Sequence, residues 1–324
     1  MNTHRKRIEA CLSNQAPDRL PIALWRHFPV DDQTPDGLAR ATLAFQRNFD
    51  FDVIKVTPSS SYCLKDWGAE DAWRGASEGT RDYTRRVIQH PEDWENLPTL
   101  DPRKGNLNDQ LQCLSILKEE IGIETPIIQT IFNPLAQAKN LAGGENLLVY
   151  MRRYPQALHA GLKTITETTL RFIEAVKKTG IAGIFYAVQH AQYSLLSSEE
   201  YHIFGRAYDL QILETTQDMW LKMLHLHGKD VMFEMFNEYP VEVINWHDRE
   251  TPPSIGEGKN LFKNIVCGGI QRDTMLLGTP DQVKSEAQEA IDVTSGKRLI
   301  LGTGCVVPIT APYGNILAVR QVVE

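Results

Sequence analysis

Short apolar runs that end in polar residues recur along the chain and predict β-strands. Strands buried on both faces of a parallel sheet are apolar along their whole length, as these runs are. They lie at residues 19–29, 51–58, 125–134, 180–190, 221–227, 241–248, 264–271 and 298–305. Because helix-like segments separate most of them, the pattern predicts one α/β domain over residues 1–324, a (β/α)8 TIM barrel. An open doubly wound sheet is the alternative, but a barrel accounts better for the polar strand ends.

Several of the intervening segments carry helix start signals. At residues 34–36 and 279–281, the sequence Thr-Pro-Asp places a capping hydroxyl before a proline at the first helical position. Ser197 followed by Glu200 has the spacing of a capping box. The predicted helices cover residues 3–13, 34–48, 107–121, 145–179, 197–220, 279–291 and 312–323.

Residues 59–106 interrupt the alternation of strand and helix. This stretch holds Trp67, Trp73 and Trp94 among many charged residues, with little helical periodicity. A long segment of this kind inside a compact domain is typical of a functional loop. We therefore predict an inserted hairpin or excursion after the second strand, lying over one end of the barrel.

Composition and charge narrow the class of protein. A chain of 324 residues, 42% hydrophobic and 23% charged, suits a globular barrel of roughly 250 residues with insertions. No apolar run approaches the ~20 residues of a membrane span, and no apolar segment follows the charged N-terminal residues, so we expect a cytoplasmic protein without membrane association. The net charge of −7 without a basic cluster argues against nucleic-acid binding. Five widely spaced cysteines predict reduced thiols.

Several histidines follow the carboxyl ends of predicted strands, which is where the active sites of barrel enzymes lie. His225 and His227 are two residues apart on one predicted strand, so their side chains project from the same face. Cys305 ends the last strand and could add a thiolate. Zinc prefers this set of ligands, and a catalytic zinc keeps a fourth position open. The alternative is that the histidines form a hydrogen-bonded pocket wall and Cys305 is a small buried hydrophobe.

Three further histidines follow predicted strand ends and are candidates for catalytic acid–base chemistry. They are His27, His190 and His247. Arg26 could clamp a carboxylate or phosphate, or instead form a salt bridge with the acidic pair at 31–32. Lys55 interrupts an apolar run and either faces an anion or extends outward to solvent. These cations predict a small anionic substrate.

Neutral polar and aromatic residues at the strand ends are further candidates for substrate binding. Amides suit the orientation of a polar ligand better than acid–base chemistry, although they can also satisfy loop backbone groups. Tyr186 could line the cavity, with core packing as the alternative. The set comprises Gln129, Asn133, Tyr186, Gln189, Asn245 and Gln271.

Several motifs together resemble the uroporphyrinogen decarboxylase superfamily. In order they are Asp18-Arg19-Leu20-Pro21, Phe132-x-Pro134, His225-Leu226-His227-Gly228, the Gly-Thr-Pro-Asp-Gln-Val of residues 278–283, Gly302-Thr303-Gly304-Cys305 and Thr310-Ala311-Pro312. The resemblance runs almost end to end. It implies a (β/α)8 barrel and an enzyme that is either a decarboxylase or a zinc-dependent methyltransferase linked to a corrinoid protein.

The resemblance is divided between the two branches. Decarboxylases of the family carry an aspartate after the second strand and a histidine in the closing Gly-x-Gly turn, where this chain has Pro58-Ser59 and Thr303. Methyltransferases carry His-x-Cys-Gly at the fifth strand and a cysteine at the eighth. Here His227 replaces the first of those cysteines, whereas His225 and Cys305 match. The resemblance therefore implies zinc on His225, His227 and Cys305.

Three hypotheses follow. The first is zinc-dependent methyl transfer involving a corrinoid, carried by a partner protein, or a small thiol or ether substrate. The second is a metal-free decarboxylase in which Arg26 and Lys55 grip the acid and His190 or His247 protonates the carbanion. The third is a non-catalytic, ligand-binding relative. Barrels of this size often form homodimers, and we keep that expectation as well.

Overall fold

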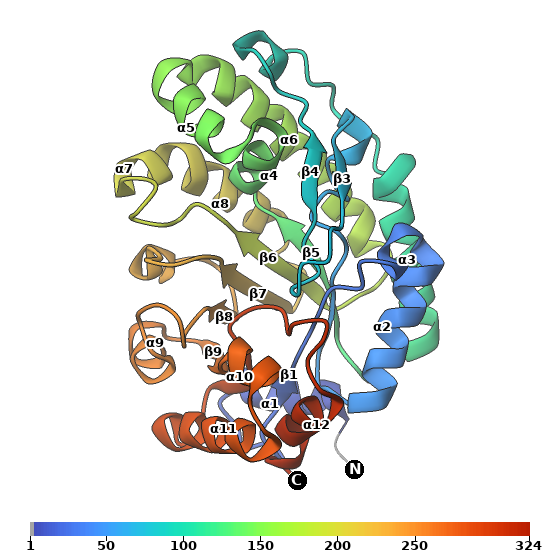
Figure 1. Cartoon of the computed structure of the whole chain (residues 1–324), viewed down its shortest axis with the longest axis vertical. Helices are drawn as coiled ribbons and strands as arrows, with labels where there is room; N and C mark the ends of the chain where they lie inside the picture. The colour runs from blue at the N-terminus through green and yellow to red at the C-terminus, as the bar shows by residue number, and fades with distance from the viewer. Residues whose placement is uncertain (1–2) are drawn as a thin grey trace.

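The computed structural model describes residues 3–324 and contains an eight-stranded parallel sheet. Each strand falls within one of the apolar runs, and every residue of these strands is buried, which explains their continuous hydrophobicity. The strands are β1 (Ile22–Ala23), β2 (Ile54–Val56), β5 (Ile127–Phe132), β6 (Gly183–Val188), β7 (Leu221–Leu226), β8 (Val243–Trp246), β9 (Ile265–Ile270) and β10 (Leu299–Thr303). The prediction of an α/β barrel is confirmed (Figure 1).

The sheet runs in the order β1-β10-β9-β8-β7-β6-β5-β2, so β1 and β2 are its edges. These two strands form no ladder with each other, but the backbone amide of Asp52 donates to the carbonyl of Ile22 at 2.8 Å. The sheet is thus a nearly closed barrel. Its carboxyl ends all point the same way, so the polar strand tips meet at one end.

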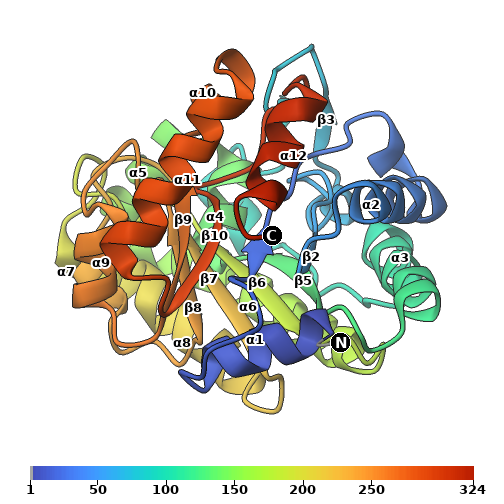
Figure 2. The ribbon, with the colours of Figure 1, turned by 90° about the horizontal axis from the view of Figure 1, so that it is seen from below.

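Helices surround the sheet (Figure 2). The α-helices are α1 (His4–Leu12), α2 (Pro35–Phe49), α3 (Gly105–Ile121), α4 (Pro134–Ala142), α5 (Gly144–Arg153), α6 (Pro155–Lys177), α7 (Ser198–Tyr201), α8 (Ala207–Thr215), α9 (Ile255–Leu261), α10 (Arg272–Leu277), α11 (Pro280–Thr294) and α12 (Tyr313–Gln321). Single turns of 3₁₀-helix lie at Asp31–Gln33, Lys65–Trp67, Pro91–Trp94 and Phe233–Phe236, and a π-helical turn at His202–Arg206. Between residues 3 and 324, no helix combines the length and the apolar character needed to cross a bilayer.

The predicted caps of α2 and α11 are confirmed, since the hydroxyls of Thr34 and Thr279 accept from the amides of Gly37 and Gln282. The single helix predicted at 145–179 is wrong. It is two helices, because Pro155 has no amide hydrogen and begins a new helix after Tyr154, whose backbone is not helical.

Other helical segments also differ from the prediction. The helix predicted at 197–220 is α7, the π-helical turn and α8, and it ends at Thr215. The sequence analysis also missed α4, α9 and α10, which are too short for their periodicity to stand out.

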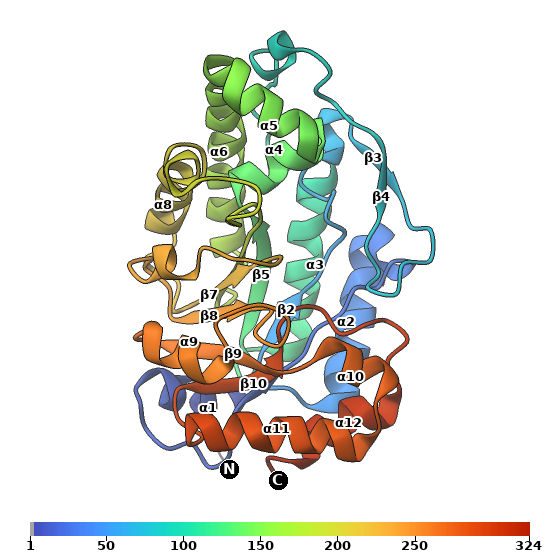
Figure 3. The same ribbon diagram turned by 60° about the vertical axis from the view of Figure 1, so that its left-hand side comes forward.

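The insertion after β2 contains an antiparallel hairpin of β3 (Glu70–Ala72) and β4 (Asp82–Arg85), as predicted. The hairpin forms a sheet of its own, separate from the barrel (Figure 3). Its connecting loop reaches α10, where Glu78 forms an ion pair with Arg272. The hairpin therefore touches the carboxyl-end rim of the barrel without sharing the barrel's strand pairing.

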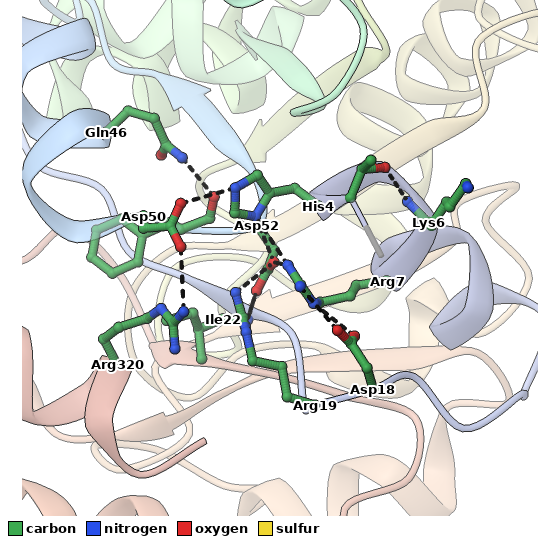
Figure 4. Close-up of polar contacts among 12 residues, drawn as sticks. His4, Lys6, Arg7, Asp18, Arg19, Ile22, Gln46, Asp50, Asp52 and Arg320 are labelled. Carbon is green, nitrogen blue, oxygen red and sulfur yellow. Dashed lines mark hydrogen bonds and ion pairs between the residues drawn. The ribbon is translucent and has the colours of Figure 1, made fainter. Parts of the chain in front are cut away.

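At the opposite end of the barrel, a buried carboxylate joins α1 to the first two strands. Asp52 accepts from the side chains of His4, Arg7 and Arg19 at 2.6–3.1 Å and from the amide of Ile22 at 2.9 Å (Figure 4). We call these five residues the amino-end cluster. Burial alone would raise the pKa of Asp52, but the hydrogen bonds from His4 and Arg19 bring that pKa below its usual value.

Candidate metal centre and substrate cavity

A cavity of about 320 Å³ opens at the carboxyl ends of the strands, as expected for a barrel enzyme. Its floor comes from strand ends and its outer wall from the hairpin and α4. The lining residues on which the following description depends are Trp25, His27, Lys55, Glu78, Arg81, Tyr83, Arg86, Lys139, Phe185, Gln189, His225, His227 and Cys305.

Four potential metal ligands meet at one side of this cavity. The ligand atoms of His225, His227, His247 and Cys305 all lie within 4.8 Å of one another, and we call these residues the histidine–cysteine cluster. The Sγ atom of Cys305 lies 3.7 Å from Nε2 of His225 and 3.9 Å from Nδ1 of His227. Bond lengths to tetrahedral zinc place its nitrogen and sulfur ligands roughly 3.3–3.8 Å apart. The spacing therefore fits a single ion.

Asn245 on β8 fixes the orientation of His225. Its amide nitrogen donates to the carbonyls of Cys267 and Thr303, at 2.9 and 3.1 Å, so its oxygen must be the atom that faces His225 Nδ1 at 2.6 Å. His225 then carries its proton on Nδ1 and presents the lone pair of Nε2 to the cluster. Such a partner on the outer nitrogen is usual for a metal-binding histidine.

His247 joins the cluster from the end of β8. Its Nδ1 lies 3.3 Å from a carboxylate oxygen of Glu250, whereas its Nε2 is buried and has no hydrogen-bond partner within residues 3–324. A buried nitrogen without a partner is costly unless something binds it. The sequence analysis treated His247 as a catalytic acid, and the structure instead places it beside the two predicted histidine ligands.

The environment keeps the histidines neutral, which is the form that binds metal. Burial, together with the neighbouring imidazoles, holds the pKa of His225 well below its usual value. The same causes lower the pKa of His227 to about 3. Burial also raises the pKa of the Cys305 thiol, although Arg272 opposes this. In the metal-free protein the cluster therefore consists of neutral donors.

Lys55 points into the cavity, as one reading of the sequence predicted. Its Nζ lies 4.5 Å from the ring centre of Phe185 and 5.9 Å from that of Trp25, and it donates to Thr57 Oγ1 at 3.3 Å. Burial lowers the pKa of Lys55 to about 7. No carboxylate of residues 3–324 forms an ion pair with it, so an anionic ligand would supply the missing partner.

His27 and Gln189 also line the cavity. Nδ1 of His27 and Oε1 of Gln189 are buried and lack hydrogen-bond partners in the described chain. Burial, with the charges of Lys55 and Arg81, lowers the pKa of His27 to about 3. Both side chains thus offer free polar atoms to a bound molecule.

Several candidates do not line the cavity. After β1 ends at Ala23, Trp25 and His27 line the cavity, whereas the guanidinium of Arg26 lies over Phe28 and Phe45 and donates to the carbonyl of Ile309 at 3.0 Å. The interpretation of Arg26 as a clamp for substrate within this cavity is therefore corrected.

The alternation of side chains along a strand removes other candidates from the cavity wall. Gln129 accepts from Gln110, and both Asn133 and Tyr186 donate to Asp209 in the layer outside the sheet. The remaining candidates that do not line the cavity are His190, which is buried, and Gln271, whose backbone amide donates to Glu286.

Some lining residues were missed by the sequence analysis. Arg81, Tyr83 and Arg86 of the hairpin segment face the cavity, and so does Lys139 of α4. Burial lowers the pKa of Lys139 to about 8, and Arg86 adds to this. No strand pattern marks these residues, because they belong to the insertion and to an unpredicted helix. The many charged residues of the insertion were a signal for Arg81 and Arg86, but not for Lys139.

Comparison with known proteins gives a consistent picture. The profile of the family described as "Uroporphyrinogen decarboxylase (URO-D)" matches residues 3–324. The Methylcobamide:CoM methyltransferase MtbA of Methanosarcina acetivorans is 23% identical over 97% of this chain and 95% of its own. MtaA of Methanosarcina barkeri, another Methylcobamide:CoM methyltransferase, is 22% identical over 98% of this chain and 96% of its own.

The structural comparison supports the same architecture. A methyltransferase from Methanosarcina mazei superposes with a TM-score of 0.87 at 19% identity, covering 99% of this chain and 98% of the other. At this identity the superposition establishes the shared fold alone.

Proposed function

Because the chain belongs to the uroporphyrinogen decarboxylase family, we propose that this enzyme is a zinc-dependent methyltransferase. It would move a methyl group between a corrinoid, held by a partner protein, and a small anionic acceptor or donor such as a thiol or thioether. The observation that carries the proposal is the convergence of His225, His227 and Cys305 beside a cavity that also contains Lys55. The methyltransferase activity of the similar proteins MtbA and MtaA supports it.

His225, His227 and Cys305 would hold the metal. A zinc ion there would lower the pKa of a bound thiol and so keep its sulfur as a nucleophilic thiolate. The protein contributes the orientation of the ligands, chiefly through Asn245, and the burial of His225 and Cys305. Compared with the cysteine-rich centre of the methyltransferase branch, two imidazoles and one thiolate leave the metal less electron-rich and a stronger Lewis acid.

Lys55 and His27 would position the rest of the substrate. The ammonium of Lys55 would pair with an anionic tail, and the free Nδ1 of His27 would accept a hydrogen bond or donate one, according to its tautomer. Lys139 and Arg86 add positive charge on the outer wall. This arrangement favours a small acceptor that combines a thiol with a carboxylate or sulfonate.

The direct test combines metal analysis with an assay of methyl transfer. Purified protein dialysed against zinc should retain one zinc per chain, and it should transfer the methyl group of methylcobalamin to CoM or 3-mercaptopropionate faster than to uncharged 2-mercaptoethanol. The loss of methylcobalamin absorbance and the mass of the thioether product report the reaction. Removal of zinc with a chelator and the Cys305→Ser variant should each abolish it. Transfer that persists in both cases would contradict the proposal.

The decarboxylase alternative has less support from the cavity. It assigned substrate binding partly to Arg26 and proton donation to His190 or His247, but neither Arg26 nor His190 lines the cavity. Release of carbon dioxide from candidate acids in the presence of chelator would favour the alternative over methyl transfer.

A further inference from the structure

The fourth member of the histidine–cysteine cluster is connected to the inserted hairpin by an unbroken series of side-chain contacts. Nδ1 of His247 lies 3.3 Å from Oε2 of Glu250. Both oxygens of Glu250 accept from Arg272, at 2.8 and 3.0 Å. Arg272 also donates to Glu78 in the loop between β3 and β4. The hairpin is thereby linked to a potential metal ligand.

The exposure of these side chains shows where the series begins and ends. Glu78 is 38% exposed, Arg272 and Glu250 are 14% and 22% exposed, and His247 is 5% exposed. The contacts therefore run from the surface of the cavity wall to the buried cluster. A bidentate arginine–carboxylate pair such as Arg272–Glu250 transmits orientation well, because its two parallel hydrogen bonds fix both planes.

We propose that His247 is a displaceable fourth metal ligand, and that Glu78 of the hairpin holds it toward the metal through Arg272 and Glu250. This inference rests on the proposed metal site. The free Nε2 of His247 closes the coordination when the cavity is empty, and a substrate thiolate takes its place when the cavity is filled. Glu78 and Glu250 are positioning residues, since neither offers an atom to the cluster.

The arrangement gives the hairpin a second effect besides walling the cavity. Because the hairpin shares no strand pairing with the barrel, the contact of Glu78 with Arg272 can break without disturbing the sheet. Loss of that contact would free Arg272 and loosen the hold of Glu250 on His247. A ligand that displaces Glu78 would thus also ease the release of His247 from the metal.

Two affinities measured on Co²⁺-loaded protein test the proposal. One is the affinity for Co²⁺, obtained by competition with a chromophoric chelator. The other is the affinity of the Co²⁺ protein for 2-mercaptoethanol, read from the new thiolate-to-cobalt absorption band as the thiol binds and releases its proton to the buffer. This uncharged thiol reports on the metal without engaging Lys55.

His247→Ala should move the two affinities in opposite directions. The affinity for Co²⁺ should fall about 100-fold, because a ligand is lost. The affinity for 2-mercaptoethanol should rise about 10-fold, because no internal ligand must leave. Glu78→Gln should lower the Co²⁺ affinity by a smaller factor, about 3- to 10-fold, as loss of an outer partner does. His247→Gln provides a second variant in case the alanine protein does not fold.

Glu289→Gln is the matched control. Glu289 pairs with Arg249 and, within residues 3–324, its side chain forms no hydrogen bond or ion pair with His247, Glu250 or Arg272, so its variant should match the wild type in both affinities. If the wild type binds no Co²⁺ with a cysteine-thiolate band, the metal site and the proposed function fail together. If Co²⁺ binds and His247→Ala changes neither affinity, the metal site stands and His247 is no ligand. Equal effects of Glu78→Gln and Glu289→Gln would overturn the role of the hairpin.

Discussion

The two ends of the barrel differ in whether their buried polar atoms have hydrogen-bond partners. In the amino-end cluster, both oxygens of Asp52 accept hydrogen bonds from side-chain or backbone donors. In the histidine–cysteine cluster, Nε2 of His247 has no partner in the described chain, and Cys305 makes only long contacts with its neighbours. The polar atoms of Asp52 are fully hydrogen-bonded within the protein, whereas Nε2 of His247 remains available to a ligand.

This difference suggests that the amino-end cluster stabilises the fold, whereas the histidine–cysteine cluster serves ligand binding. A fully bonded buried network makes the native state specific and holds elements together, as Asp52 holds α1 to β1 and β2. Unpaired buried groups cost free energy, and a protein retains them where a ligand completes them. Substitutions at the two ends should therefore have different readouts, and each experiment below can break or sharpen that distinction.

The largest effect is expected from Asp52→Asn, which should lower the free energy of unfolding by about 3–5 kcal/mol, because it removes the buried carboxylate that pairs with Arg19 and accepts hydrogen bonds from His4 and the amide of Ile22. Metal content should not change. Urea denaturation and metal analysis measure the two quantities. Asp50→Asn is the control, since Asp50 pairs with His4 and Arg320 but is 57% exposed, and its loss should cost less than about 1 kcal/mol. Equal losses for the two variants would remove the distinction.

Cys305→Ala should weaken metal binding and leave the free energy of unfolding almost unchanged, which is the reverse of the Asp52→Asn result. It should weaken zinc binding by about 10²–10³-fold, roughly one ligand's share of a structural site, while the stability of the metal-free protein changes by less than about 1 kcal/mol. Chelator competition and thermal unfolding measure the two. Cys113→Ala removes another buried thiol and should leave zinc binding unaltered. If Cys305→Ala bound zinc as tightly as Cys113→Ala, then Cys305 would not be a zinc ligand.

Asn245→Ala should affect both readouts, because Asn245 supports a ligand from a buried position. Zinc affinity should fall about 10- to 100-fold, and the free energy of unfolding by about 1–3 kcal/mol. Asn315→Ala is the comparison, since Asn315 donates to the carbonyls of Met275 and Gly278, neither of which belongs to the histidine–cysteine cluster, and it should affect stability only. Unchanged zinc affinity in Asn245→Ala would contradict the assigned orientation of His225.

The smallest effect concerns pH. The folded-state pKa of Asp52 lies below its usual value, so its contribution to stability is present above pH ~4 and is lost as the pH falls through the folded-state pKa. The difference in unfolding free energy between wild type and Asp52→Asn should therefore be constant near neutral pH and narrow in acid. Urea denaturation at several pH values measures it. A difference independent of pH would mean that Asp52 is not ionised in the folded protein.

The sequence was informative where a simple periodicity governs the structure. All eight strands follow from buried apolar runs, and the pairing of His225 with His227 follows from the two-residue repeat of a strand. The same repeat would have excluded Tyr186, had it been applied at each strand end. Tyr186 alternates with residues that line the cavity.

Other features were beyond local patterns. The position of His247 in the cluster depends on the turn after β8, and the cations of the outer wall depend on how the insertion folds back over the barrel. Asn133 and Tyr186 carry polar atoms at strand ends, yet they serve Asp209, whose burial no local pattern reveals. Contacts between distant segments decide such cases.

The separate sheet of the inserted hairpin has a consequence for how this enzyme could diversify. Residues 59–106 supply part of the cavity wall, whereas the histidine–cysteine cluster lies at the carboxyl ends of the barrel strands. The hairpin shares no strand pairing with the barrel, and the insertion meets the rest of the chain through side chains and a few backbone hydrogen bonds, such as that from Ile309 to Ser77. The insertion can therefore be exchanged or lengthened while the barrel strands keep their register. Swapping this segment between relatives is thus a rational route to new acceptor preferences.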